Sequence, residues 1–230
     1  MVVLAFVAVA CLAVAVTSGL TARKLATRPP TAAERAAAAA TAVADRWRSW
    51  TAGRIFPSGL RYSTSLLTTE DASRVAIGTQ TACASAIDPA FAALATRDHC
   101  RAGLRATYLD QLQGILYTVG VLAFPTARLA AAFSAGLSAD HTGVFALSAL
   151  AVPGTASSLF SAQARQAATT RQAGPFVILT VAGYANGQPA GRGQEARAEI
   201  FAPAAQFAAD VARPLTAPIR VNCRSPQWSC

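Results

Sequence analysis

The two histidines of this 230-residue chain are its first candidates for catalysis, because imidazole is the usual general base beside a side-chain nucleophile. Each one follows an aspartate: Asp98 precedes His99, and Asp140 precedes His141. A catalytic base and the carboxylate that orients it must hydrogen-bond, and neighbours in sequence seldom point at one another. We therefore interpret His99 as a helix-end residue and His141 as a loop residue, and the sequence predicts no catalytic residue.

Residues 191–196 read Gly-Arg-Gly-Gln-Glu-Ala and match the dinucleotide-binding pattern G-x-G-x-x-A. That pattern requires a strand that ends directly before it and a later strand that carries an acidic residue. Here seven residues separate Tyr184, at the end of a predicted strand, from Arg192, and no clear strand follows. We interpret the segment as a loop and expect no cofactor.

Cysteine chemistry is the next candidate, because four of the five cysteines lie outside the apolar N-terminal segment that contains Cys11. These four are Cys83, Cys100, Cys223 and Cys230. They lack the C-x-x-C spacing of a metal site, so we predict no metal. Their even number and their two local pairs are typical of disulfides formed in an oxidising compartment. Of the three connectivities, the short separations favour Cys83 with Cys100 and Cys223 with Cys230. The alternative is four unpaired thiols.

Four carboxylates lie at positions that predict structural roles. Glu70 and Asp71 suit the acidic first turn of a short helix over residues 68–76. Asp88 precedes Pro89, as an N-cap precedes the first residue of a helix, and Asp110 follows a predicted strand. We assign none of them to catalysis.

The charge balance predicts the kind of partner. The formal net charge is +9, and the sequence pI is about 10.2. Such a field attracts anionic polymers or lipid head groups. The arginines recur from Arg23 to Arg224 without the dense basic run of a DNA-binding segment, so we do not expect a nucleic-acid partner. A protein or an anionic polymer of the cell envelope remains the expected partner.

The elements that would position these residues begin with an apolar segment. Residues 1–20 carry no charge and are long enough for a helix to cross a bilayer, so we predict a transmembrane anchor over residues 1–22. A signal peptide is the competing interpretation, but Arg23 and Lys24 follow the apolar run and no basic residue precedes it. The positive-inside rule favours a cytoplasmic domain, whereas the paired cysteines favour an extracytoplasmic one, which we expect.

Residues 23–53 form the predicted juxtamembrane and stalk segment. Thr31 and Glu34 have the spacing of a capping box, which predicts a helix from there to about Trp50. Val43, Trp47 and Trp50 would form its apolar stripe.

Residues 54–230 form the predicted extracytoplasmic domain. We expect an α+β fold in which a roughly four-stranded, mainly antiparallel sheet carries its helices on one face. The predicted strands are residues 104–110, 115–124, 144–152 and 176–184, with an edge strand or extended loop in residues 54–65. The predicted helices are residues 68–76, 88–94, 125–136, 157–172 and 196–212.

Several phrases of the domain resemble uncharacterised, membrane-anchored proteins of actinobacteria. They are residues 50–57 (Trp-Thr-Ala-Gly-Arg-Ile-Phe-Pro), 105–108 (Arg-Ala-Thr-Tyr), 173–176 (Ala-Gly-Pro-Phe) and 182–187 (Ala-Gly-Tyr-Ala-Asn-Gly). The resemblance covers most of the chain after the apolar segment. It implies a single-pass membrane protein and carries no activity.

The expected function is therefore a non-enzymatic binding or envelope-associated role for a domain held at the cell membrane. The alternative is an extracytoplasmic enzyme whose site the sequence does not reveal. The two would differ in structure, because an enzyme should show a pocket with convergent polar groups around His99 or His141.

Overall fold

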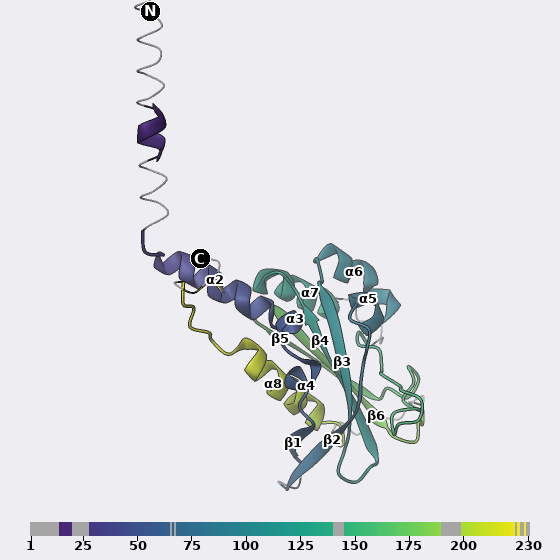
Figure 1. Cartoon of the computed structure of the whole chain (residues 1–230). Helices are drawn as coiled ribbons and strands as arrows, with labels where there is room; N and C mark the ends of the chain where they lie inside the picture. Colours follow the sequence, from purple (N-terminus) through teal and green to yellow (C-terminus); the bar gives the residue numbers. More distant parts are fainter. Residues whose placement is uncertain are drawn as a thin grey trace, which may run out of the picture. The chain divides into compact units, whose positions relative to one another are not determined.

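The computed structural model describes residues 14–19, 28–64, 66, 68–139, 145–189, 199–223, 225 and 228. The chain divides into two compact units, one of residues 1–38 with 221–230 and one of residues 39–220. All the strands described lie in the second unit (Figure 1).

The first unit contains the start of helix α2 (Ala32–Ala44). The predicted capping box is confirmed: Thr31 Oγ1 accepts the Glu34 N–H at 3.2 Å, and the Glu34 carboxylate accepts the Thr31 N–H at 2.8 Å. Of the predicted anchor, residues 1–22, only 14–19 are described, and they are helical. Within the described residues, no helix has the length and hydropathy needed to cross a membrane.

The predicted helix to Trp50 is wrong in its extent, because α2 stops at Ala44 and two single turns follow. These are α3 (Arg46–Ser49) and α4 (Ala52–Ile55), and Thr51 caps α4 by accepting the Arg54 N–H. The predicted apolar stripe of Val43, Trp47 and Trp50 does pack against the core.

The second unit is built on a six-stranded sheet in the order β1-β2-β3-β4-β6-β5, with every neighbouring pair antiparallel. Its strands are β1 (Gly59–Ser63), β2 (Thr69–Ile77), β3 (Ala102–Leu109), β4 (Ile115–Ala123), β5 (Ala167–Ala173) and β6 (Phe176–Tyr184). The prediction of an α+β fold with an antiparallel sheet is confirmed. The prediction of four strands is wrong, since the sheet has six.

Three predicted strands are confirmed as β3, β4 and β6, and the predicted edge strand is β1. Residues 68–76 were predicted as a helix but form strand β2, which pairs with both β1 and β3. Residues 144–152 were predicted as a strand, but those described form only one isolated bridge, between Leu147 and Ile87. The predicted helix over 157–172 is also wrong, because it covers turns and then β5.

Apolar residues cover both faces of the sheet, so the prediction of helices on one face is wrong. Successive side chains of a strand point to opposite faces. Val119 and Val121 therefore join the core under helix α8 (Pro203–Thr216), while Leu116 and Leu122 join the core under α7 (Ala127–Ala139). Figure 1 shows α8 and α7 beside the sheet.

The second core also contains α5 (Cys83–Ala86), the single 3₁₀ turn η1 (Pro89–Phe91) and α6 (Ala92–Arg97). Asp88 caps η1 by accepting the Ala90 N–H, as predicted. The predicted disulfide between Cys83 and Cys100 is present and brackets these turns. Cys223 is also disulfide-bonded, but Cys230 lies outside the described residues, so their predicted pairing stays a prediction.

Candidate functional site

His99 does not line the cavity of about 230 Å³ that is described below. His99 is exposed just after α6 and has a positive φ of 57°, which places it at a sharp turn. The adjacent Asp98 is buried and pairs with Arg97. His141 and Asp140 lie outside the described residues, as does the Gly-Arg-Gly-Gln-Glu-Ala segment.

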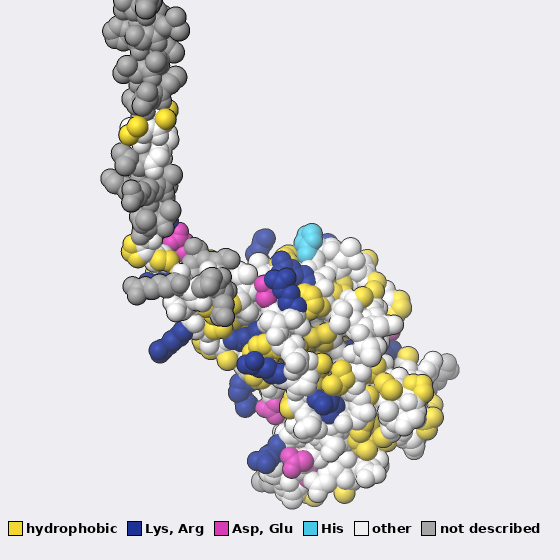
Figure 2. Space-filling view, in the orientation of Figure 1, with side chains coloured by type: hydrophobic (Ala, Val, Ile, Leu, Met, Phe, Trp, Pro, Cys, Tyr) yellow, Lys and Arg dark blue, Asp and Glu magenta, His cyan; other side chains and the backbone are white. Residues whose placement is uncertain are grey.

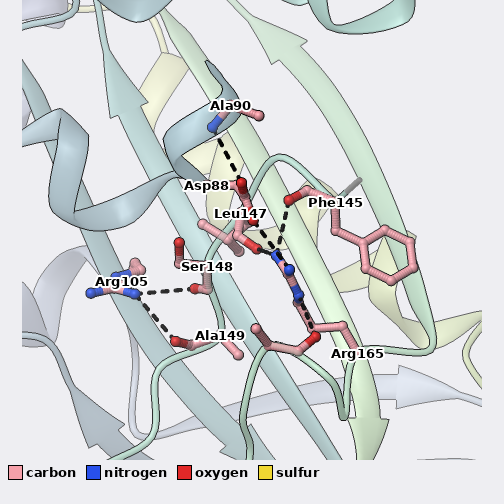
Figure 3. Close-up of polar contacts among 9 residues, drawn as sticks. Asp88, Ala90, Arg105, Phe145, Leu147, Ser148, Ala149 and Arg165 are labelled. Carbon is pink, nitrogen blue, oxygen red and sulfur yellow. Dashed lines mark hydrogen bonds and ion pairs between the residues drawn. The ribbon is translucent and has the colours of Figure 1, made fainter. Parts of the chain in front are cut away.

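Arg165 is the centre of a buried polar network (Figure 3). Its guanidinium donates to the carbonyls of Ala162, Phe145 and Leu147 at 2.8 to 2.9 Å. It also pairs with the Asp88 carboxylate at 3.2 Å. Because residues 145–166 have no helix or strand of their own, this side chain supplies the donor for the buried Leu147 carbonyl and for two partly buried carbonyls.

A second set of contacts holds the same segment to strands β3 and β4. Arg105 donates to the carbonyls of Ser148 and Ala149. The buried hydroxyls of Thr107 and Thr118 bond to each other and to the backbone of Leu150. Because both sets bond backbone groups of a segment without regular structure, we assign these residues a structural role.

A cationic cluster surrounds Trp50, between α3 and α4. The Arg54 guanidinium carbon lies 3.9 Å from the centre of the Trp50 ring, and that of Arg46 lies 5.0 Å from it. Both are within cation–π range. Arg46 is buried and donates to the carbonyls of Pro214 and Leu215, in the last turn of α8. Arg54 is exposed.

Arg74 adds a third guanidinium to the Trp50 cluster, which we define as Arg46, Trp50, Arg54 and Arg74. Arg74 donates to the Phe56 carbonyl, and its Nη1 lies next to Gly53 of α4. Burial lowers the pKa of Arg46, and the positive charge of Arg54 lowers it further. No carboxylate among the described residues forms an ion pair with any of the three arginines.

A cavity of about 230 Å³ lies where the β1–β2 and β3–β4 hairpins approach the start of α8. Its polar lining includes Tyr62, Tyr117 and three carboxylates, those of Glu70, Asp110 and Glu199. The Tyr62 hydroxyl donates to Glu70 at 2.5 Å. Burial raises the pKa of Tyr62, and this hydrogen bond raises it further.

The sequence interpretation of the four acidic residues is confirmed in part. Asp110 follows β3 directly and accepts the backbone N–H groups of Gly114 and Ile115, each at 2.7 Å, so it closes the β3–β4 turn. Glu70 and Asp71 are strand residues rather than a first helical turn. Within the described residues, no three His, Cys, Asp or Glu side chains are arranged to hold a metal ion.

Sequence reasoning missed both the Trp50 cluster and the cavity. The spacing of Trp50 and Arg54 could have indicated a contact, but Arg74 comes next to Gly53 and the Phe56 carbonyl only because β2 is a strand. Glu199 joins Tyr62 through the packing of α8 on β1, for which the sequence carries no local signal.

Comparisons of this chain with protein-family models, with curated proteins and with solved structures found no match. The assignment of a function therefore depends on the geometry of the chain itself.

Proposed function

We propose that this chain is a membrane-anchored protein whose extracytoplasmic domain binds a phosphate-bearing anionic partner of the cell envelope, without catalysis. The Trp50 cluster is the observation that carries the proposal. The anchor is the apolar segment of residues 1–22, and the contact with the membrane is through residues 1–20.

The location is supported by the Cys83–Cys100 disulfide. Structural disulfides persist in oxidising compartments and are rare in the cytosol. The apolar segment would anchor the chain in the membrane, and the disulfide lies in the domain that follows it. A domain on the outer side of the membrane agrees with both the anchor and the disulfide.

The Trp50 cluster is suited to an anion because it concentrates positive charge, and no carboxylate in the described part of the chain pairs with its arginines. The rings and carbonyls that hold Arg46, Arg54 and Arg74 are uncharged, so they position the guanidinium groups without neutralising them. Guanidinium groups bind phosphate oxygens through paired N–H donors, which favours a phosphate-bearing partner. Figure 2 shows dark blue side chains spread over the visible face, with few magenta ones among them.

The test is binding of the purified full-length protein to polyphosphate, with and without added salt. We expect affinity to fall steeply between about 0.05 M and 0.5 M salt, because the contacts are between exposed charges. The Arg54→Gln variant should bind about fivefold more weakly, a loss of about 1 kcal/mol. Vesicles that contain phosphatidylglycerol, tested in parallel, would show whether a lipid surface is the preferred source of phosphate.

The matched control is Arg128→Gln, which removes one exposed arginine from α7 and so makes the same change in net charge. Its affinity should stay within about twofold of that of the unchanged protein. Equal losses in the two variants would contradict a localised site, and affinity that does not respond to salt would contradict an electrostatic one.

A further inference from the structure

We propose that the cavity beside the start of α8 binds a primary ammonium group at the end of a short alkyl chain. This site differs in place and in charge from the Trp50 cluster, so it does not rest on the proposed function. Its ligand could be supplied as a free amine or as a lysine side chain, which share this chemistry.

The first argument is the sign of the charge. Among the described residues, the lining contains Glu70, Asp110 and Glu199 and no Lys or Arg, in a chain whose formal net charge is +9. Burial raises the pKa of Tyr117, and negative neighbours, Asp110 and Glu70 among them, raise it further. The cavity is thus a local region of negative potential.

The second argument is that Asp110 is nine-tenths buried but only half used. It is 7% exposed, and both turn N–H groups bond to its Oδ1. Its Oδ2 has no hydrogen bond within the described part of the chain. This oxygen is not among the described side-chain atoms that are buried without a partner, so it stays open to a cationic donor in the cavity, from which a carboxylate oxygen accepts strongly.

The other two carboxylates also keep free acceptor positions among the described residues. Glu70 uses Oε2 for the Tyr62 hydroxyl, and no bond to its Oε1 is present. Glu199 is exposed, and its carboxylate makes no hydrogen bond there. The three carboxylates come from β2, the β3–β4 turn and the residues before α8. Three acceptors from three segments suit the three donors of an ammonium better than the planar fork of a guanidinium.

The third argument is the apolar part of the lining. Leu66 and Leu112 line the cavity, yet 84% and 80% of their surfaces are exposed. Large apolar side chains exposed beside a cavity are typical of a binding site. They would cover the hydrocarbon part of the ligand, and the Tyr62 and Tyr117 rings are suitable neighbours for its cationic end.

The start of α8 does not convert this cavity into an anion site. A helix N-terminus attracts anions through its free N–H groups. Here Pro203 has no N–H, and those of Ala204 and Ala205 already bond to the carbonyls of Phe201 and Ala202.

The experiment is calorimetric titration of the purified full-length protein with n-pentylammonium, and separately with N-acetyl-lysine methylamide. Pentanol and pentylguanidinium are the uncharged and planar comparisons. We expect saturable binding of pentylammonium with a Kd below about 1 mM, at least tenfold tighter than that of either comparison. A tighter lysine derivative would identify a protein side chain as the source.

The Glu70→Gln/Glu199→Gln double variant should weaken pentylammonium binding at least tenfold, because it removes two charges and keeps the shape of both side chains. Asp71→Asn is the control, since Asp71 neighbours Glu70 on β2, is exposed, and does not line the cavity. It should bind within twofold of the unchanged protein, and thermal melting of both variants would verify their folding. Absence of saturable binding by the folded protein, tighter binding of pentylguanidinium, or equal losses in the two variants would overturn the proposal.

Discussion

Arg165 is a buried cation that hydrogen-bonds the backbone of a segment without regular structure. We expect its replacement to lower the stability of the protein. The Arg165→Met variant should lower the free energy of unfolding by about 3 kcal/mol, because the buried Leu147 carbonyl, two partly buried carbonyls and Asp88 lose a charged donor. Arg165→Lys should recover only part of this, since one ammonium cannot reproduce the planar fork. Urea unfolding midpoints measure both.

Arg171→Met is the control for that prediction, because Arg171 is exposed on the edge strand β5 and the substitution is the same. It should change the free energy of unfolding by less than about 0.5 kcal/mol. If Arg165→Met were equally mild, the segment 145–166 would not depend on the buried guanidinium.

Protonation of Glu34 should open the capping box at the start of α2. The Arg28 side chain, and then the backbone and hydroxyl of Thr31, lower its pKa from 4.5 to about 2. A carboxyl whose pKa is depressed by folding contributes stability above its unfolded pKa and loses it as pH falls through the folded one. The capping box should therefore be intact above about pH 4.5 and open progressively toward pH 2.

Amide chemical shifts of Thr31 and Glu34 through a pH titration measure this opening. The Glu34→Gln variant is the comparison, because glutamine can still accept the Thr31 N–H but has no charge to lose. Its amide shifts should stay constant between pH 4.5 and pH 2. A titration midpoint near 4.5 in the unchanged protein would contradict the capping geometry.

At the scale of the elements, the sequence indicated the strands that carry large apolar residues and missed those that do not. β3, β4 and β6 are buried on both faces and read as apolar runs. The only buried residues of β2 are Ala72 and Ala76, and β5 has none, so neither strand shows a clear hydrophobic period. In β2 the pair Glu70-Asp71 also has the composition of a first helical turn. The apolar residues of segment 145–166, such as Phe145, Leu147 and Phe160, led to the prediction of a strand and a helix. The segment has neither, and side chains of Arg105 and Arg165 donate hydrogen bonds to its backbone carbonyls.

The disulfide ties the α5–α6 region together, and its removal should be measurable. Cys83 and Cys100 are 17 residues apart, for which the chain-entropy estimate is about 3 kcal/mol. The Cys83→Ala/Cys100→Ala variant should lose about that much free energy of unfolding. Because Cys223 is also disulfide-bonded, a reductant acts on both proteins, and it should bring their free energies of unfolding to the same level. Complete alkylation of Cys83 in protein from its native host would contradict the bridge and the proposed location.

At the scale of the molecule, the positive net charge predicted an anionic partner but gave no indication of the acidic cavity and its proposed cationic ligand. The excess of arginine agrees with the Trp50 cluster, but the cavity collects three carboxylates from segments as distant as Glu70 and Glu199. Only the long-range packing of α8 against the hairpins brings them together, so no local pattern could have indicated that site.

The strand order also bears on how fast the second unit can form. The pairings of β1 with β2, β3 with β4 and β5 with β6 close locally through short turns, and the pairing of β2 with β3 spans the residues between Ile77 and Ala102. These pairings make two groups, β1 to β4 and β5 with β6. They join only where β6 pairs with β4, which requires closing a loop of about 50 residues. Such non-local pairing slows folding. We expect the two hairpin groups to form early and their joining at β4 and β6 to set the refolding rate.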